Sequence, residues 1–302
     1  MKEIITPRNA KVMTVIAMTL FGFLGLFTRY IDLPASVIVA SRGILGALFL
    51  LMFIYLTGSR ISRDDIYSNM FSLICSGVCL GLNWLFLFEA FKSIEISVAN
   101  VLNYMTPVIV ILISPLVFKT RLTVSKLLCA LTAIFGLILV TGLLEEGSID
   151  ANSYGITCGI LAAVFYTGLV IFNKKLRSIG SFDRTFTQLL IAGILVFAYT
   201  LVTVDYSTLT FDAATVGMLV LMALFLTALT FTLYFGSLAY LDASTSAVYT
   251  YLEPLVGILL GVTVLNEDLG ILGWIGAALI LGSTLLSELW DQRMQKKNSD
   301  EG

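Results

Sequence analysis

The tetrapeptides Tyr104-Met-Thr-Pro107 and Tyr251-Leu-Glu-Pro254 lie 147 residues apart in a chain of 302 residues, and the sequence around them matches at the same offset. Gly43-Ile-Leu45 likewise resembles Gly193-Ile-Leu195 at an offset of 150. Self-similarity over so long a stretch indicates that the chain contains two copies of one structural unit. Further matched pairs are Ser97 and Ser244, Val101 and Val248, Ile111 and Ile258, Leu112 and Leu259, Val117 and Val264, and Leu122 and Leu269.

The composition is that of a membrane protein rather than of a water-soluble one. Hydrophobic residues make up 58% of the chain and charged residues only 13%, whereas a soluble domain has roughly 25% charged residues. The net charge of −2 provides no field that would attract nucleic acid, so no nucleic-acid partner is expected. The chain has no histidine, and its four cysteines form no Cys-x-x-Cys pair. We therefore expect no cofactor, no metal site and no enzymatic activity.

Polar clusters and prolines divide the hydrophobic sequence into ten stretches that can cross a bilayer as helices. The polar residues 1–10 carry no small-residue cleavage signature, so we expect the first stretch to be retained. The loops between the stretches are too short for a soluble catalytic domain. The predicted spans are 11–28, 34–57, 66–90, 95–118, 123–142, 153–172, 185–204, 213–238, 243–265 and 269–289.

Lysine and arginine are distributed unevenly between the two sides of these spans. If the first span enters from the cytoplasm, fifteen of the 18 fall on the cytoplasmic side and two, Arg29 and Lys92, on the other, while Arg42 lies within the second span. Short cytoplasmic loops are enriched in these residues. The pattern predicts a multi-pass protein of the bacterial cytoplasmic (inner) membrane with both termini in the cytoplasm.

Ten spans and an internal repeat predict two halves of five helices each. An odd number of spans inverts the second copy in the membrane, so the predicted fold class is an all-α integral membrane protein with a 5+5 inverted repeat. Two similar halves in opposite orientation can exchange conformations, which is the basis of alternating access. The predicted units are residues 1–146, residues 147–289 and a cytoplasmic tail, residues 290–302.

The sequence resembles the EamA-type ten-helix members of the drug/metabolite transporter superfamily. The resemblance is carried by Tyr251-Leu-Glu-Pro254, by Leu265-Asn-Glu267-Asp-Leu269 and by Gly273-Trp-Ile-Gly276, which follow the family pattern of a proline in the ninth helix, an acid at its outer end and a glycine-bearing tenth helix. In the first half, Lys119-Thr-Arg121 stands where the family often has an acid. The resemblance implies a solute carrier without ATPase activity and with a central cavity between its halves.

Three charged residues lie inside the predicted spans, where a charge is costly unless it is paired or faces water. Arg42 and Glu253 fall near the middle of the second and ninth spans, and Glu89 lies near the outer end of the third. Arg42 and Glu253 either form an ion pair that holds two helices together, or bind a solute carboxylate and a solute ammonium or coupling proton, respectively. Glu89 either takes part in coupling or gating, or reaches the outer surface.

Prolines, amides and aromatic rings complete the candidate site. Pro107 and Pro254 lie at matching positions within predicted helices, where each removes a backbone hydrogen bond and acts either as a gating hinge or as a static kink. Asn100, Asn103 and Tyr104 share one helix face with Pro107 and either line a wet cavity or bond to neighbouring helices. The predicted substrate-binding residues are Arg42, Asn83, Trp84, Asn100, Asn103, Tyr104, Tyr166, Tyr234, Tyr249, Tyr251 and Glu253; the predicted coupling or gating residues are Glu253, Glu89, Pro107 and Pro254.

These features predict a secondary active transporter, a monomer or homodimer in the lipid bilayer, that moves a small amphipathic organic solute by alternating access. An acid, an arginine and several tyrosines suit an amino acid, an amine or a drug-like metabolite, with export as the expected direction and protons as the candidate coupling ion. Import of a quaternary amine or other metabolite is the alternative within the class. A non-transporting membrane subunit and an intramembrane enzyme are the alternatives outside it.

Overall fold

The computed structural model describes residues 6, 8–58, 61–118, 124–140, 149–238, 240–241 and 249–300. This part of the chain is helical and contains no strand. In chain order its elements are α1 (Ala10–Gly22), α2 (Leu24–Tyr30), α3 (Ala35–Leu56), α4 (Arg63–Ser68), α5 (Met70–Ser93), α6 (Ile96–Asn103), α7 (Thr106–Phe118), α8 (Val124–Val140), α9 (Ile149–Asn173), α10 (Ser181–Thr203), the 3-10 turn η1 (Tyr206–Thr208), α11 (Ala213–Ala223), the π-helical segment η2 (Leu224–Leu229), α12 (Thr230–Leu238), α14 (Leu252–Val264) and α15 (Gly270–Asp300).

Seven of the described helical stretches are long and apolar enough to cross a membrane. One of them joins α1 to α2, another joins α6 to α7, and a third runs through α11, η2 and α12. Three shorter apolar helices, of 10–17 residues, lie within α8, α14 and α15. Each of the ten stretches predicted from the sequence overlaps one of these helices. The last helix continues to Asp300, through most of the segment predicted as a tail.

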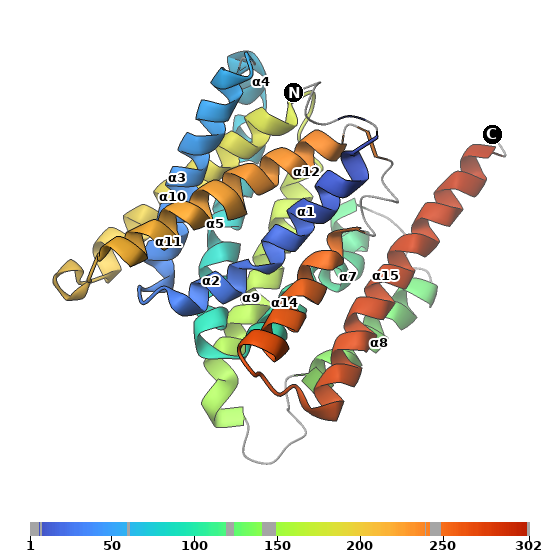
Figure 1. Ribbon diagram of the computed structural model, residues 1–302. Coiled ribbons are helices and arrows are strands. Elements are labelled where there is room, and N and C mark those ends of the chain that lie inside the picture. Colours follow the sequence, from blue (N-terminus) through green and yellow to red (C-terminus); the bar gives the residue numbers. More distant parts are fainter. Residues whose placement is uncertain are drawn as a thin grey trace.

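The helices pack in pairs that join the first half of the chain to the second. α3 lies against α10, and α8 lies against α15, a pair that forms one flank of the molecule in Figure 1. α5 packs on α9, α1 packs on α12, and α6 lies against α14. α1 begins and α15 ends at the same end of the molecule (Figure 1). Because the closest pairs connect the halves, the apolar core is shared between them.

α3 and α10 cross at a glycine from each helix. A Cβ atom added to Gly43 would meet the backbone of Gly193, and one added to Gly193 would meet the backbone of Gly43 and Ile44. Both glycines begin the repeated Gly-Ile-Leu stretch, so equivalent positions of the two copies touch each other. Small residues permit such close contact between helices in lipid, where packing replaces the hydrophobic effect as the driving force.

A second contact between the halves involves Glu267, in the connection between α14 and α15. Its carboxylate accepts hydrogen bonds from the backbone N–H groups of Ile96 (2.7 Å) and Ser97 (3.0 Å) and from the Ser97 hydroxyl (2.7 Å). The Glu267 side chain is only 6% exposed, and Nη2 of Arg29 lies 4.0 Å from it. Arg29 also donates to the Ile94 carbonyl. A carboxylate at a helix N-terminus accepts hydrogen bonds from free N–H groups and interacts favourably with the helix dipole. Glu267 therefore caps α6 from the other half.

We predict that Gly43→Val lowers the melting temperature and the yield of folded protein, because the side chain must enter the backbone contact with Gly193. Overpacking of this kind costs about 1–3 kcal/mol. Gly217→Val is the matched control, because a Cβ atom at Gly217 meets nothing within 4 Å. Fluorescence-detected gel filtration after heating gives the measurement, and equal melting temperatures for the two variants would contradict the prediction.

Candidate functional site

Interruptions of two helices meet around Tyr104 and Glu253. The fourth predicted span breaks between α6 and α7, and the ninth breaks at Tyr251, just before α14. The sequence predicted bent helices at the two prolines, but Pro107 and Pro254 instead lie in the first turn of α7 and of α14. Proline is tolerated there because the N–H groups of a first turn have no partner within the helix.

The carbonyl groups that face these prolines are both satisfied by hydroxyl groups. Four residues before Pro107, the Asn103 carbonyl accepts a hydrogen bond from the Thr106 hydroxyl at 2.9 Å. Four residues before Pro254, the Thr250 carbonyl accepts one from the Tyr104 hydroxyl at 3.0 Å. In a bilayer, a carbonyl freed by proline needs such a partner. Tyr104 therefore connects the break in one half to the break in the other.

Glu253 lies beside the same hydroxyl. Its Oε2 atom is 3.2 Å from the Tyr104 hydroxyl, which has a single proton to donate. That proton can reach the Thr250 carbonyl or the Glu253 carboxylate, but not both with full strength. A protonated Glu253 could instead donate to the Tyr104 oxygen while Tyr104 donates to Thr250, and all three groups would then be satisfied. The hydrogen bonding of this cluster thus depends on the protonation state of Glu253.

Arg42 is almost completely buried on α3, with 2% of its surface exposed. Its Nε donates to the Thr227 hydroxyl at 2.9 Å, and its guanidinium carbon lies 3.8 Å from the centre of the Trp84 ring and 5.5 Å from that of Phe88. Cation–π contacts of this kind hold a desolvated guanidinium in place. Its Nη1 atom is buried and has no hydrogen-bond partner among the residues that the structure describes. Arg42 is therefore fixed in orientation but retains donor capacity.

Arg42 and Glu253 do not form a direct ion pair. Among the described residues, the one ion pair within 4.0 Å joins Arg29 to Glu267. The charges of Arg42 and Glu253 nevertheless act on each other through the protein. Of the two interpretations left open by the sequence, the structure does not support direct pairing of the two side chains. It leaves one buried cation and one half-buried acid with separate partners.

Aromatic residues surround this pair of charges. The Tyr104 and Tyr251 rings lie 6.2 Å apart at 47°. Tyr166 on α9 is within electrostatic reach of Glu253 and Tyr234, yet it remains 40% exposed. Tyr234 on α12 is half-buried and its ring lies 5.2 Å from that of Phe235. The Tyr166 and Tyr234 side chains are thus only partly covered by the protein.

The three asparagines differ in their surroundings. Asn83 donates from its amide to the Asn103 side chain (3.0 Å) and to the Ala162 carbonyl (2.9 Å), so these two amides join α5, α6 and α9. Asn100 packs against Gly257 of α14, and its buried Nδ2 has no hydrogen-bond partner. Asn83 and Asn103 therefore have the contacts of helix-joining residues, whereas Asn100 still has an unused donor.

Two predicted residues are not brought into contact with the Arg42 and Glu253 groups. Glu89 is half-buried near the end of α5, where it bonds to Tyr154 and lies close to Lys92. Tyr249 is half-buried and helical, directly before the break at Tyr251. Both residues stay candidates from the sequence alone.

Two groups near the site were not predicted from the sequence. Thr227 orients Arg42 and belongs to η2, where its hydroxyl donates to the Met222 carbonyl, five residues back. Arg184 directly precedes the predicted span 185–204, but it lies in the first turn of α10, 5.2 Å from the Phe235 ring and within electrostatic reach of Tyr166. A capping analysis around Gly180 and Ser181 could have placed this helix start four residues earlier than predicted; no sequence signal marks the π segment.

A model of the EamA-like transporter family matches residues 9–142 and, a second time, residues 153–289. The chain belongs to the EamA-like transporter family. Its relatives include "Uncharacterized transporter YxxF" of Bacillus subtilis, 24% identical over 256 residues (83% of this chain, 80% of the relative). "Uncharacterized inner membrane transporter YicL" of Salmonella typhimurium is 24% identical over 304 residues (95% and 98%). One crystal structure is similar in fold, with a TM-score of 0.63 and 16% identity over 96% of this chain and 99% of the other.

The family assignment explains the membrane-spanning helices and the internal repeat. This EamA-like transporter is a multi-pass membrane protein of the drug/metabolite transporter type, and its two family matches correspond to the two copies detected by the 147-residue offset. Membership in a transporter family implies a small-molecule substrate. The residues around Arg42 and Glu253 lie between the two matched copies and are the candidate binding site.

We expect Tyr104→Phe to lower the melting temperature of the purified transporter, since the hydrogen bond from the Tyr104 hydroxyl to the Thr250 carbonyl is lost. One intramolecular hydrogen bond contributes about 0.5–1.5 kcal/mol to stability. The phenyl ring preserves the packing against Tyr251, so the change isolates the hydroxyl. Tyr55→Phe, at a side chain that is 69% exposed, is the control. If the two variants had equal melting temperatures, the proposed bridge between the two helix breaks would be wrong.

Proposed function

We propose that the chain is a secondary active transporter that exports a small amphipathic solute carrying both a carboxylate and an ammonium group. The observation that carries this proposal is the separation of two opposite charges, Arg42 and Glu253, that are buried or half-buried without pairing to each other. A zwitterion supplies one partner for each: its carboxylate meets the free Nη1 of Arg42, and its ammonium meets Glu253. Amino acids and related drug-like metabolites have this chemistry.

The proposed architecture is ten transmembrane helices in a 5+5 inverted repeat, with both termini in the cytoplasm of a bacterium. The pattern of helix pairs supports this architecture. In a 5+5 repeat, α1 is equivalent to α9, α3 to α10 and α5 to α12. The pair α5 and α9 is then equivalent to the pair α12 and α1, and the pair α3 and α10 is equivalent to itself. The two family matches and the contact of Gly43 with Gly193 support the same symmetry. Inverted repeats of this kind are suited to alternating access around a central site.

In this orientation the cap formed by Glu267 on α6 lies on the external side. It connects the end of the second half to the start of α6, so opening the external side would require the Glu267 and Arg29 contacts to separate. We propose that this contact closes the outer pathway and that Pro107 and Pro254 mark the hinges. The coupling ion is proposed to be the proton, because the hydrogen bonding of Tyr104 depends on whether Glu253 carries one.

We predict that Glu253→Gln lowers transport at least tenfold in proteoliposomes and flattens its pH dependence, because the amide neither titrates nor attracts an ammonium ion. A hydrogen bond to a charged group is worth about 1.5–3 kcal/mol, which corresponds to a tenfold effect or more. Asp32→Asn removes the same charge from an exposed loop and serves as the control. Transport by Glu253→Gln with an unchanged rate and pH profile would exclude both roles of this acid.

We also expect the carboxylate of the solute to be required. Amino acids are compared with the amines that lack only the carboxylate, first as ligands in thermal-shift assays and then as competitors of transport. Amino acids should bind at least tenfold more tightly than the matching amines, because only their carboxylate offers an acceptor to Arg42. Thr227→Val removes the hydroxyl that orients Arg42 and should reduce this difference in affinity. Equal binding of the amines would favour the cationic solute of the alternative hypothesis. Flux in the absence of any other protein separates a transporter from a subunit.

A further inference from the structure

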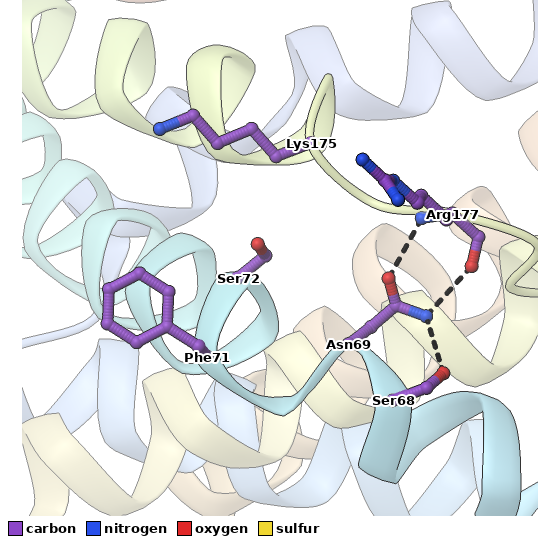
Figure 2. Close-up of a pocket in the computed structure, with 6 residues that line it drawn as sticks. All are labelled: Ser68, Asn69, Phe71, Ser72, Lys175 and Arg177. Carbon is purple, nitrogen blue, oxygen red and sulfur yellow. Dashed lines mark hydrogen bonds between the residues drawn. The ribbon is translucent and has the colours of Figure 1, made fainter.

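A pocket of about 440 Å³ lies away from the candidate transport site, where α4 meets α5 and α9 is followed by the loop to α10 (Figure 2). The apolar span formed by α5 begins at Met70, and the span within α9 ends at Asn173, so the pocket lies where two membrane spans end. It is lined by Ser68, Asn69, Phe71, Ser72, Lys175 and Arg177. Its depth in the membrane therefore corresponds to the level of lipid headgroups.

The amide of Asn69 holds the two walls of this pocket together. Its oxygen accepts a hydrogen bond from the backbone N–H of Arg177 (2.8 Å), and its nitrogen donates to the carbonyl groups of Arg177 (2.8 Å) and Asp65 (2.8 Å). Figure 2 shows the two bonds between Asn69 and Arg177, which join the loop to the start of α5. The backbone that carries the two cations is thereby fixed against α5.

The pocket has two positive charges and no negative one among its lining residues. Neither Lys175 nor Arg177 takes part in an ion pair within the described chain. The Lys175 ammonium lies 5.3 Å from the centre of the Phe172 ring. Figure 2 shows the Ser72 hydroxyl directed into the space between the two cationic side chains. Ammonium, guanidinium and hydroxyl donors around one space are the groups that bind a phosphate.

Exposed apolar side chains continue from the pocket along α5. Phe71 is 74% exposed and packs edge-on against Phe172 at 6.4 Å, and Ile74, one turn further into the span, is 45% exposed. Phe71 and Ile74 are three residues apart and share a helix face. A free phosphate ion makes no apolar contact with such a surface, whereas the glycerol and acyl chains of a lipid would cover it.

We propose that this pocket binds the headgroup of an anionic phospholipid, with the phosphate held by Lys175 and Arg177 and the acyl chains lying over Phe71 and Ile74. The site is independent of the solute and of the direction of transport. It would tie the loop after α9 to the start of α5, since the lipid contacts both. Lipid bound there would therefore stabilise the pairing of α5 with α9.

The test is native mass spectrometry and thermal shift on the full chain, delipidated in detergent and titrated with phosphatidylglycerol, phosphatidylcholine or inorganic phosphate. We expect the protein to bind phosphatidylglycerol in preference to phosphatidylcholine. The double variant Lys175→Gln with Arg177→Gln should bind phosphatidylglycerol about 30-fold more weakly, because each lost cation removes roughly 1 kcal/mol of binding free energy. Arg8→Gln with Lys11→Gln removes two exposed cations at the start of α1 and is the matched control. Melting without lipid confirms that both double variants fold.

Each alternative result would overturn the proposal. Equal loss of binding in the two double variants would indicate a general electrostatic attraction rather than a site. Equal binding of phosphatidylcholine would remove the requirement for an anionic headgroup. Displacement of the lipid by millimolar inorganic phosphate, with the same thermal shift from phosphate alone, would assign the pocket to a free anion.

Discussion

The need to satisfy every backbone carbonyl in a medium without water determines how the centre of this protein is built. Pro107 and Pro254 each remove a donor at equivalent positions of the repeat, and the two copies solve the problem differently. In the first half, the neighbouring Thr106 supplies a hydroxyl; in the second, Tyr104 supplies it from across the interface. The second solution places a tyrosine proton between a backbone carbonyl and the carboxylate of Glu253. A structural requirement of the helix break thus also positions the candidate site.

Arg42 on α3 is the second charged group of the candidate site, and its surroundings also compensate a buried polar group. A buried guanidinium is costly unless its donors and charge are compensated. The π segment supplies the Thr227 hydroxyl and α5 supplies the Trp84 face, but Nη1 is left without a partner. The described residues therefore compensate the Arg42 guanidinium incompletely. A bound carboxylate would complete the compensation, which is why the proposed function rests on the free donor and not on the number of polar residues nearby.

Composition and hydrophobic runs were sufficient to locate the stretches that overlap the seven long and three shorter apolar helices of the described chain, because lipid imposes length and apolarity on every span. Of the stripe Asn100, Asn103 and Tyr104, only Tyr104 contacts Glu253 in the described part of the chain, while Asn100 packs against Gly257 and Asn103 bonds to Asn83. The role of Thr227 could not be predicted, since a π segment changes which side a residue faces without changing hydropathy. The mutual position of Arg42 and Glu253 depends on helix breaks and side-chain rotamers, which the period of the sequence does not encode.

The cap on α6 also has a consequence for how the chain is made. Glu267 is synthesised 171 residues after Ile96, and it accepts a hydrogen bond from the backbone N–H of Ile96. A nascent chain that has inserted only its first half presents the start of this helix without its carboxylate, and Arg29 without its acid. The first half can reach its final arrangement only after the ninth helix has left the ribosome. Products terminated before residue 267 would lack this cap on α6.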